Sequence, residues 1–341
     1  MKRKSLGILV WVALLGSASA EECHLDRVAQ VELQVGDQVL FPARLNGHDF
    51  RVALYTAGDY SLISNEVVDA LKLKRRALDP SINIFLGAQR ATQSVFIDSL
   101  QIGNAELRHA QFVVDPPLDR WSHRPSGEVA ANASLSVFGT LDVELDMAHR
   151  KLALYSPEHC PRIGVYWADI AAETPIYRGY LGNLYFPMEL DGKLVEATFS
   201  AETATTSLEE MVSSKLYGFD RHSPGIEMRP GADGKPEPYY KAMKITAKGL
   251  AVTNADVRLK PTWSACHLAF NKPTDHAVGF DGCLGRYPLN LGRDVLEKLH
   301  LYFAVKEGVL YLHTVRGHDA RSRSCSAADA PSSFAVRRLD R

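Results

Sequence analysis

Hydrophobic and polar positions alternate along much of this chain, and short turns interrupt the alternation. Apolar residues at every second position in Val31–Val35 and Val39–Leu45 predict two strands, because successive side chains of a strand point to opposite faces. Asn46-Gly47 predicts a tight hairpin turn, and Phe50–Leu54 predicts a third strand. Helical spacing of apolar residues is confined to short stretches, the first of them after Ser64, a residue suited to cap a helix.

The same pattern occurs twice, 145 positions apart. Residues 50–64 read FRVALYTAGDYSLIS, and residues 195–209 read VEATFSAETATTSLE. The offset pairs Asn46-Gly47 with Asp191-Gly192 and continues without a gap through strand, loop and helix, which chance similarity between strands does not readily give. Two copies of one unit predict a mainly β fold with two homologous lobes, whose central loops face each other.

The ends of the chain differ in composition from its middle. Residues 1–20 predict a cleavable export signal, because a basic start precedes a short apolar run and a small-residue cleavage site. The remaining 321 residues are too many for one ordinary core. The other predicted segments are an N-terminal lobe at 21–160, a linker at 161–182, a C-terminal lobe at 183–314 and a disordered tail at 315–341 that is rich in Arg, Ser and Ala.

Charge and motifs exclude several classes of function. The formal charge is −1, and it becomes −4 without the three basic residues of the signal, so neither a nucleic acid nor a membrane surface is expected as a partner. No segment after the signal is apolar enough to insert into a membrane. The chain shows no P-loop, GxSxG or HExxH motif, and no cofactor is expected. The signal predicts a periplasmic or secreted protein.

Five cysteines fit export, because an oxidising compartment preserves disulfides. Spacing alone does not prove connectivity. The predicted pairs are Cys23 with Cys160 and Cys266 with Cys283, which leaves Cys325 free. A metal site at Cys266, His267 and His276 is the rival interpretation, but no CxxC or HxxxH spacing supports it, and no metal is expected.

Each copy resembles the core of a lobe of the retropepsin-type aspartic proteases. In that family a strand and an Asn-Gly turn lead to a strand ending in Asp-Thr-Gly-Ala, then to a further strand and a helix, and later an apolar pair plus Gly packs beneath the active loop. The matching stretches are FPARLNGHDFRVALYTAGDYSLIS (41–64) with Val137-Phe138-Gly139, and FPMELDGKLVEATFSAETATTSL (186–208) with Cys283-Leu284-Gly285. The resemblance covers residues 23–314. It implies the bilobal, pepsin-like acid protease fold in one chain, with two β-barrel-like lobes, and therefore a monomer.

The chemistry of that family requires one Asp from each loop. The two carboxylates share a proton, so that one acts as general base on a water and the other as general acid. Tyr55 and Ser200 occupy the two Asp positions here, and neither a phenol nor an aliphatic hydroxyl replaces a carboxylate at neutral pH. The resemblance places the binding cleft at Tyr55, Thr56, Ala57, Gly58 and Asp59 of the first loop and at Ser200, Ala201, Glu202 and Thr203 of the second.

Three acids could in principle replace the lost pair. Asp59 matches an acid that holds the substrate backbone in many retropepsins, and Asp220 lies beyond the helix, where an exposed or capping role is expected. Glu202 lies near the tip of the second loop, where burial would raise its pKa. Tyr55 is either a core residue or a residue of the cleft.

Three functions follow from these residues. The favoured one is an exported, catalytically inactive aspartic-protease-like protein that binds a peptide or protein segment between the lobes. The second is an aspartic-type peptidase or another hydrolase that uses Glu202, together with Asp59, in a rearranged acid centre. The third is a structural or assembly partner of another envelope protein, which would bind through the outer surface.

Overall fold

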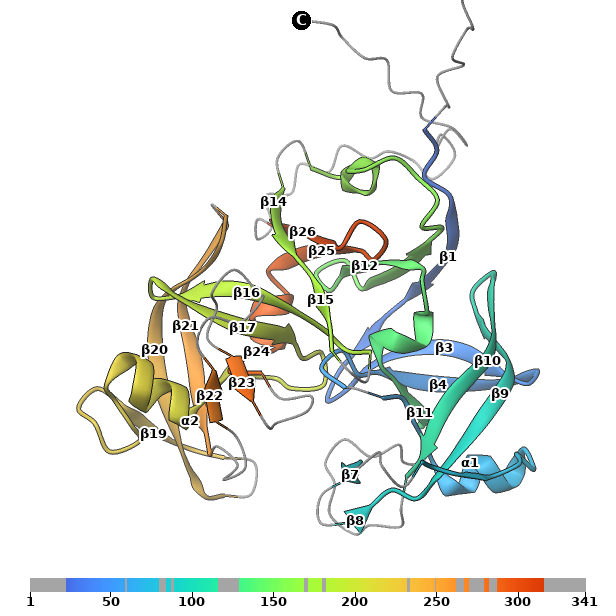
Figure 1. Cartoon of the computed structure of the whole chain (residues 1–341), viewed down its shortest axis with the longest axis horizontal. Helices are drawn as coiled ribbons and strands as arrows, with labels where there is room; N and C mark the ends of the chain where they lie inside the picture. The colour runs from blue at the N-terminus through green and yellow to red at the C-terminus, as the bar shows by residue number, and fades with distance from the viewer. Residues whose placement is uncertain are drawn as a thin grey trace, which may run out of the picture.

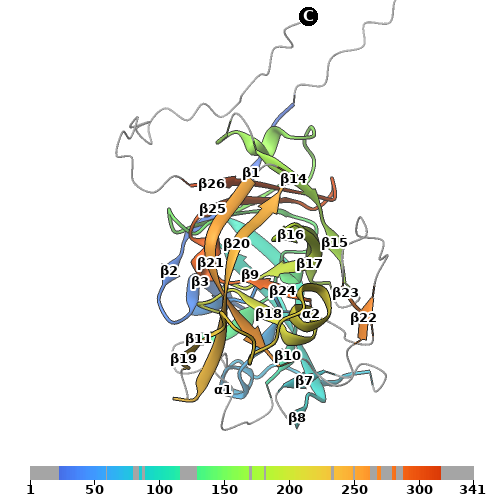
Figure 2. The same ribbon diagram turned by 90° about the vertical axis from the view of Figure 1, so that its left-hand side faces the viewer.

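The computed structural model describes residues 23–58, 60–79, 84–86, 89–115, 129–168, 171–179, 182–231, 234–248, 250–261, 267–269, 279–281 and 287–315. Within them the chain forms two lobes, each built on an eight-stranded sheet, and a six-stranded sheet that lies above both (Figure 1). The view turned by 90° shows the same arrangement (Figure 2). The prediction of a mainly β, two-lobed fold is confirmed. The predicted export signal and the chain after Val315 lie outside the described residues.

The first lobe surrounds the loop that begins at Tyr55. Its strands are, in sheet order, β2 (Gln34–Val35), β3 (Val39–Leu45), β4 (His48–Leu54), β11 (Val129–Ala133), β5 (Leu62–Ile63), β10 (Ala105–Val114), β9 (Gln93–Ile102) and β6 (Arg76–Ala77). Strand β4 is parallel to β11 and β5 is parallel to β10, whereas β5 and β11 are antiparallel. The loop after β4 therefore leaves from the middle of the sheet.

The second lobe repeats this plan around Ser200. Its strands are, in sheet order, β15 (Tyr177–Arg178), β16 (Leu184–Leu190), β17 (Lys193–Phe199), β24 (Leu289–Leu291), β18 (Ser207–Glu209), β21 (Leu250–Lys260), β20 (Pro236–Ala247) and β19 (Glu227–Pro230). Again the strand before the loop is parallel to its neighbour, β17 to β24, and β18 is parallel to β21. The two sheets have the same order of parallel and antiparallel neighbours at their centres.

The backbone repeats in detail as well as in topology. Left-handed φ angles are uncommon for residues other than glycine, so their positions mark a particular backbone path. Four such positions recur at the offset of 145 residues: Asn46 with Asp191, Gly47 with Gly192, Gly103 with Lys248, and His109 with Asn254. The repeat in the sequence is therefore also a repeat in conformation.

The six-stranded sheet joins the two halves of the chain. Its strands are, in order, β1 (Arg27–Glu32), β13 (Lys151–Tyr155), β12 (Asp142–Asp146), β25 (Leu299–Ala304), β26 (Val309–Thr314) and β14 (Ala172–Pro175). Strand β12 of the first half pairs antiparallel with β25 of the second. Strand β14 lies in the segment predicted as a linker, where the buried Ala172 and Thr174 alternate with less buried residues, so this segment is partly a strand.

Helices are short in this fold. They are α1 (Asn65–Ala70), η1 (Leu135–Phe138), η2 (Ile163–Val165), α2 (Glu210–Val212), the π-helical η3 (Ser213–Tyr217) and α3 (Arg293–Leu296). Two small hairpins are β7 (Phe85–Leu86) with β8 (Gln89–Arg90), and β22 (His267–Ala269) with β23 (Gly279–Asp281). The Ser64 hydroxyl caps α1 by accepting from the Val67 amide at 3.3 Å, as expected. No helix in the described ranges is long and apolar enough to cross a membrane.

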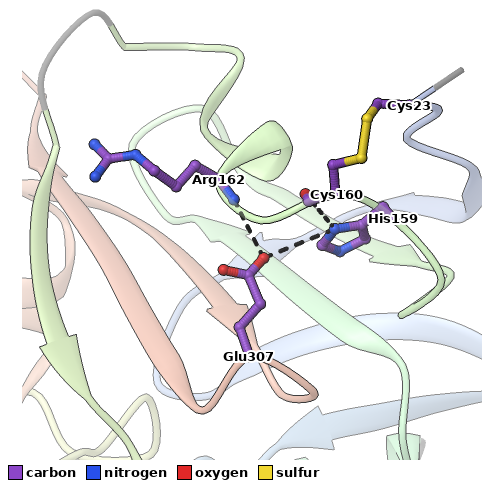
Figure 3. Close-up of a disulfide and its surroundings, with 5 residues drawn as sticks. All are labelled: Cys23, His159, Cys160, Arg162 and Glu307. Carbon is purple, nitrogen blue, oxygen red and sulfur yellow. Dashed lines mark hydrogen bonds and ion pairs between the residues drawn. A yellow bond between two sulfur atoms is a disulfide. The ribbon is translucent and has the colours of Figure 1, made fainter. Parts of the chain in front are cut away.

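A disulfide between Cys23 and Cys160 ties the start of the first lobe to its end (Figure 3). The two cysteines are 137 positions apart, and their Cα atoms lie 5.6 Å from each other. The bond closes a loop around the whole first lobe, which reduces the freedom of the unfolded chain. The first predicted pair is thus present, as is typical of proteins in oxidising compartments. Cys266, Cys283 and Cys325 lie outside the described residues.

Candidate functional site

The loops after β4 and β17 have matching backbone contacts. The Tyr55 amide donates to the carbonyl of Ala133 in β11 at 2.9 Å, and the Ser200 amide donates to the carbonyl of Leu291 in β24 at 2.8 Å. Each loop then turns back on itself, because the residue three positions later donates to the carbonyl of Tyr55 or Ser200 at 3.2 Å. Tyr55 and Ser200 therefore hold equivalent places at the ends of equivalent strands.

Thr56 connects the two loops directly. Its hydroxyl donates to the carbonyl of Phe199 at 2.9 Å and accepts from the amide of Ala201 at 2.8 Å. The side chain is 1% exposed, so both hydrogen bonds form away from water. The equivalent position in the second loop is Ala201, which has no hydroxyl to return the contact. The tie between the lobes is therefore one-sided.

Tyr55 lies over its own loop. A Cβ atom placed on Gly58 would lie 2.1 Å from Cδ1 of the Tyr55 ring, so the ring rests directly against the glycine backbone. Gly58 is the residue at this position that leaves room for an aromatic ring. Tyr55 as a whole is partly buried. Its exposure is therefore intermediate between the two roles that the sequence allowed, a core residue and a residue of the open cleft.

Ser200 is occupied within its own loop. Its side chain is buried, and its hydroxyl accepts from the Thr203 hydroxyl at 2.9 Å. No histidine is among the hydrogen-bond partners of Ser200 in the part of the chain that the structure describes. A serine nucleophile needs an adjacent base to take its proton, and the contact with Thr203 supplies none; the hydrogen-bonded group that could act as one is the Glu202 carboxylate.

Glu202 is the acid of the described residues that lies in these two loops. The residue as a whole is partly exposed, but its carboxylate oxygen Oε2 is buried and has no hydrogen-bond partner within the described ranges. Burial raises the pKa of Glu202 to about 7, against the opposing hydrogen bonds from its own amide, the Ser200 hydroxyl and the Ala57 amide and the charge of Lys260. No second carboxylate is among these leading influences. Ala57 belongs to the first loop, so Glu202 faces the junction of the lobes.

The other two acids that the sequence singled out, Asp59 and Asp220, are not found at the loop junction among the described residues. Asp59 lies outside the described residues. Asp220 is exposed, and its Oδ1 accepts from the His222 amide at 2.9 Å and the Ser223 hydroxyl at 3.1 Å, which lowers the pKa of its carboxyl. It is the capping carboxylate that the sequence predicted, and it takes no part in the loop junction.

Arg293 is a residue of the junction that sequence reasoning missed. Its guanidinium donates to the carbonyl of Ala201 at 3.2 Å and to the carbonyl of Asp37, in the first lobe, at 3.0 Å. Its amide donates to the carbonyl of Thr203 at 2.9 Å. Arg293 and Asp37 are 256 positions apart, and nothing in the local sequence of either marks the contact.

Sequence reasoning also missed three buried acids of β12, on the six-stranded sheet. Asp142, Glu144 and Asp146 are 0 to 3% exposed. They occupy alternate positions of the stretch DVELD and so lie on one face of the strand. This alternation of acids in an otherwise apolar strand was the available signal.

Glu144 is surrounded by donors from both halves of the chain. His300 Nε2, of β25, lies 2.7 Å from its Oε1, the Tyr155 hydroxyl donates to Oε2 at 2.5 Å, and Lys151 forms an ion pair with it. Burial alone would raise the pKa of Glu144, but His300 and the charge of Lys151 outweigh it and lower the pKa to about 2. Trp167 stacks on the His300 ring with centroids 3.9 Å apart.

Asp142 makes a similar set of contacts. His159 Nε2 lies 2.6 Å from its Oδ2, the Tyr302 hydroxyl donates to Oδ2 at 3.2 Å, and the Val305 amide donates to Oδ1 at 2.8 Å. Burial raises the pKa of Asp142, and the hydrogen bond from His159 opposes the rise. These groups are satisfied, so we assign this network to holding the lobes together.

Comparisons with known proteins agree with the resemblance in the first lobe. Residues 41–129 match a family model described as aspartyl protease. No curated protein matches the chain. Among solved structures the chain is similar to basic 7S globulin from soybean, with 10% sequence identity, a TM-score of 0.44, and coverage of 85% of this chain and 95% of the globulin chain. The chain is thus similar to the aspartyl proteases over residues 41–129.

Proposed function

We propose that this protein is an exported, catalytically inactive relative of the aspartic proteases that binds a peptide or protein segment between its lobes. The observation that supports it most is the pair of equivalent strand ends, at which Tyr55 and Ser200 stand where the family carries its two Asp residues. The hydroxyl tie through Thr56 keeps the loops together although the acids are gone. A scaffold kept without its catalytic pair fits binding better than cutting.

Glu202 supports a second function, hydrolysis by a single acid. A carboxyl group with a pKa of about 7 can give or take a proton near neutral pH. Against this function, the leading influences on its pKa include no second carboxylate to share a proton. The Ser200 hydroxyl accepts from Thr203 and hydrogen-bonds to Glu202 itself, so it brings no second acid to the site. We therefore rank hydrolysis below binding.

The deciding experiment is a peptidase assay on the purified chain, with a mixture of denatured proteins as substrate, from pH 3 to pH 8. We expect no new peptide termini by mass spectrometry, with or without pepstatin. Cleavage that pepstatin blocks would overturn the proposal. Cleavage lost in Glu202→Gln but kept in the matched variant Glu210→Gln, on the same lobe, would establish the second function.

Binding is tested separately from cleavage. Peptides from the same denatured proteins are passed over the immobilised chain, and those retained are identified. We expect the variants Tyr55→Ala and Thr203→Ala to retain fewer of them. Equal retention by both variants would show that the junction of the lobes is not the binding surface.

A further inference from the structure

A groove of about 910 Å³ runs along the first lobe, away from the Thr56 tie. One wall is formed by every residue from 104 to 111, which is the first seven residues of β10 and the residue before it. A second wall is formed by every residue from 136 to 141, which is the last three residues of η1 and the turn after it. The rest of the lining comes from Val113 of β10, from Val28 of β1, and from Tyr60, Ser61, Leu78 and Ile84. The volume is in the range of pockets that hold ligands.

The unbroken run of lining residues shows that the groove follows an edge of β10. A cavity above one face of a sheet contacts alternate residues of a strand, because successive side chains point to opposite faces. On one side β10 is paired with β9 from Ala105 to Val113 except at His109, but on the other side only Val113 and Val114 are paired, with β5. From Ala105 to Gln111 this second edge is paired with no strand of the described residues.

The direction of the backbone groups fits this assignment. The Val113 amide donates to the Ser61 carbonyl at 2.8 Å, and the Asp115 amide donates to the Ile63 carbonyl at 2.9 Å. Since backbone groups alternate between the two edges of a strand, the Gln111 amide points to the same edge, where β5 has ended. An unpaired edge of this kind is a template for another extended chain.

The groove carries side chains of mixed polarity and no net charge. Its charged lining residues are Glu106, Arg108 and His109. Glu106 accepts from the Ser99 hydroxyl at 2.7 Å and from Arg108 at 3.2 Å, which lowers the pKa of its carboxyl. His109 Nδ1 lies 3.6 Å from Asp98 Oδ1. Each basic group thus has an acid beside it, so the groove favours neither a strongly acidic nor a strongly basic ligand.

We propose that this groove docks an extended, uncharged peptide segment of a partner protein, which adds a strand to the free edge of β10. Backbone amides and carbonyls on an open edge are complementary to another backbone. The partly buried Leu107, Val137 and Leu141 provide contacts for small or apolar side chains on one face of the segment. The groove does not include Tyr55 or Ser200, so the proposal stands or fails independently of binding between the lobes.

His109 limits how far such a strand extends. Its φ of 54° departs from strand geometry, and neither His109 nor Asp98 opposite is among the paired residues of β9 and β10. Asn254 has the same conformation in β21 of the second lobe, so the kink belongs to the fold. We therefore expect the added segment to pair with the stretch around Gln111, on the β5 side of His109.

The experiment uses random dodecapeptides displayed on phage, selected against the purified full-length chain. Binders are synthesised, and their effect on amide hydrogen exchange is measured. We expect protection of the Gln111 amide, which faces the groove. We also expect N-methylation of the peptide to weaken binding only at the positions that pair with β10, by roughly tenfold or more at each sensitive one, since it removes one backbone hydrogen bond.

Two pairs of variants complete the test. Gln111→Pro removes the amide that faces the groove, whereas its control Gln111→Ala keeps that amide and shortens the side chain; only the proline variant is expected to lose binding. Thr140→Trp fills the groove from its exposed rim, and Thr253→Trp adds the same bulk to an exposed site on the second lobe. If Gln111→Pro fails to fold, the N-methylated peptides and the Thr140→Trp variant still test whether the peptide binds in the groove.

Three results would overturn the proposal. The first is a selection that yields no binder, and the second is a set of binders that protect only the loops at Tyr55 and Ser200. The third is dimerisation of the chain that rises with concentration and is lost in Gln111→Pro, because a second copy would then occupy the edge.

Discussion

The two lobes meet at two places, and the pKa of a buried carboxyl group is shifted in opposite directions at the two. On the six-stranded sheet, Glu144 has a histidine, a lysine and a tyrosine around it, and its pKa is lowered to about 2. At the loop junction, Glu202 has one buried oxygen without a partner among the described residues, and its pKa is raised to about 7. The first arrangement favours the ionised acid, and the second favours the neutral one.

The difference separates structure from candidate chemistry. A buried charge is tolerated when partners compensate for the water it has lost, and a fully compensated group has little tendency to exchange protons near neutral pH. A poorly compensated acid is available for proton transfer or for contact with a ligand. Of the two regions, the loop junction is therefore the one that we propose as the functional site, although the sheet contains more acids.

The largest effect is expected from removing the centre of the sheet network. Glu144→Ala removes the acid that pairs with the partly buried Lys151 and leaves His300 with Asp146 alone, and we expect a loss of about 3–5 kcal/mol in the free energy of unfolding. Denaturant unfolding followed by fluorescence measures it. The control is Glu158→Ala, whose exposed carboxylate pairs with Lys306 at 2.5 Å and which should change stability little. Equal losses in both variants would contradict the assignment.

The next effect concerns the tie between the loops. Thr56→Val removes a buried donor and a buried acceptor at once, leaving the Phe199 carbonyl and the Ala201 amide without this partner, and we expect a loss of about 2–4 kcal/mol. Thr56→Ser keeps the hydroxyl and should retain most of the stability. Calorimetry of the three proteins measures both values. A Thr56→Val variant as stable as the parent would show that the two hydrogen bonds of Thr56 contribute little to stability.

A smaller effect tests how the Tyr55 ring packs against Gly58 of its own loop. Gly58→Ala brings a methyl group against the Tyr55 ring, and we expect a loss of about 1–3 kcal/mol from overpacking. The same change in a Tyr55→Ser background should be nearly neutral, because the ring is gone. Thermal unfolding of the four proteins gives the coupling energy. If the stability changes of the two substitutions are additive, the Tyr55 ring and Gly58 are not in energetically significant contact.

The smallest effect is a contrast in pH dependence. The lowered pKa of Glu144 contributes stability that is complete above about pH 4.5 and disappears as the pH falls toward 2. The raised pKa of Glu202 acts in the other direction: the folded state holds a proton that the unfolded state has released, so stability falls as the pH rises from about 4.5 through 7.

Glu202→Gln should remove the fall in stability between pH 4.5 and pH 7 that the raised pKa of Glu202 causes. Allowing for the partial exposure of the residue, we expect the variant to be more stable than the parent by about 1–2 kcal/mol at pH 8 and to match it at pH 4. Unfolding free energies at both pH values measure the change, with Glu210→Gln as the control. A parent protein whose stability does not fall between pH 5 and pH 8 would refute the raised pKa.

The sequence by itself determined the two lobes and the residues that end their central strands. Alternation and turn residues depend on neighbours within a few positions, so the strands before Tyr55 and Ser200, the turn at Asn46-Gly47 and the cap at Ser64 were all readable. The repeat then placed Tyr55 opposite Ser200, because two copies of one unit adopt one backbone path.

Only the tertiary structure decided which distant groups meet. The contact of Arg293 with Asp37, the pairing of β12 with β25 and the contact of His300 with Glu144 join segments separated by more than a hundred residues, and no local pattern encodes them. The environment of Glu202 and the free edge of β10 were beyond the sequence for the same reason. Burial and strand pairing are properties of the assembled chain, whereas periodicity belongs to each segment alone.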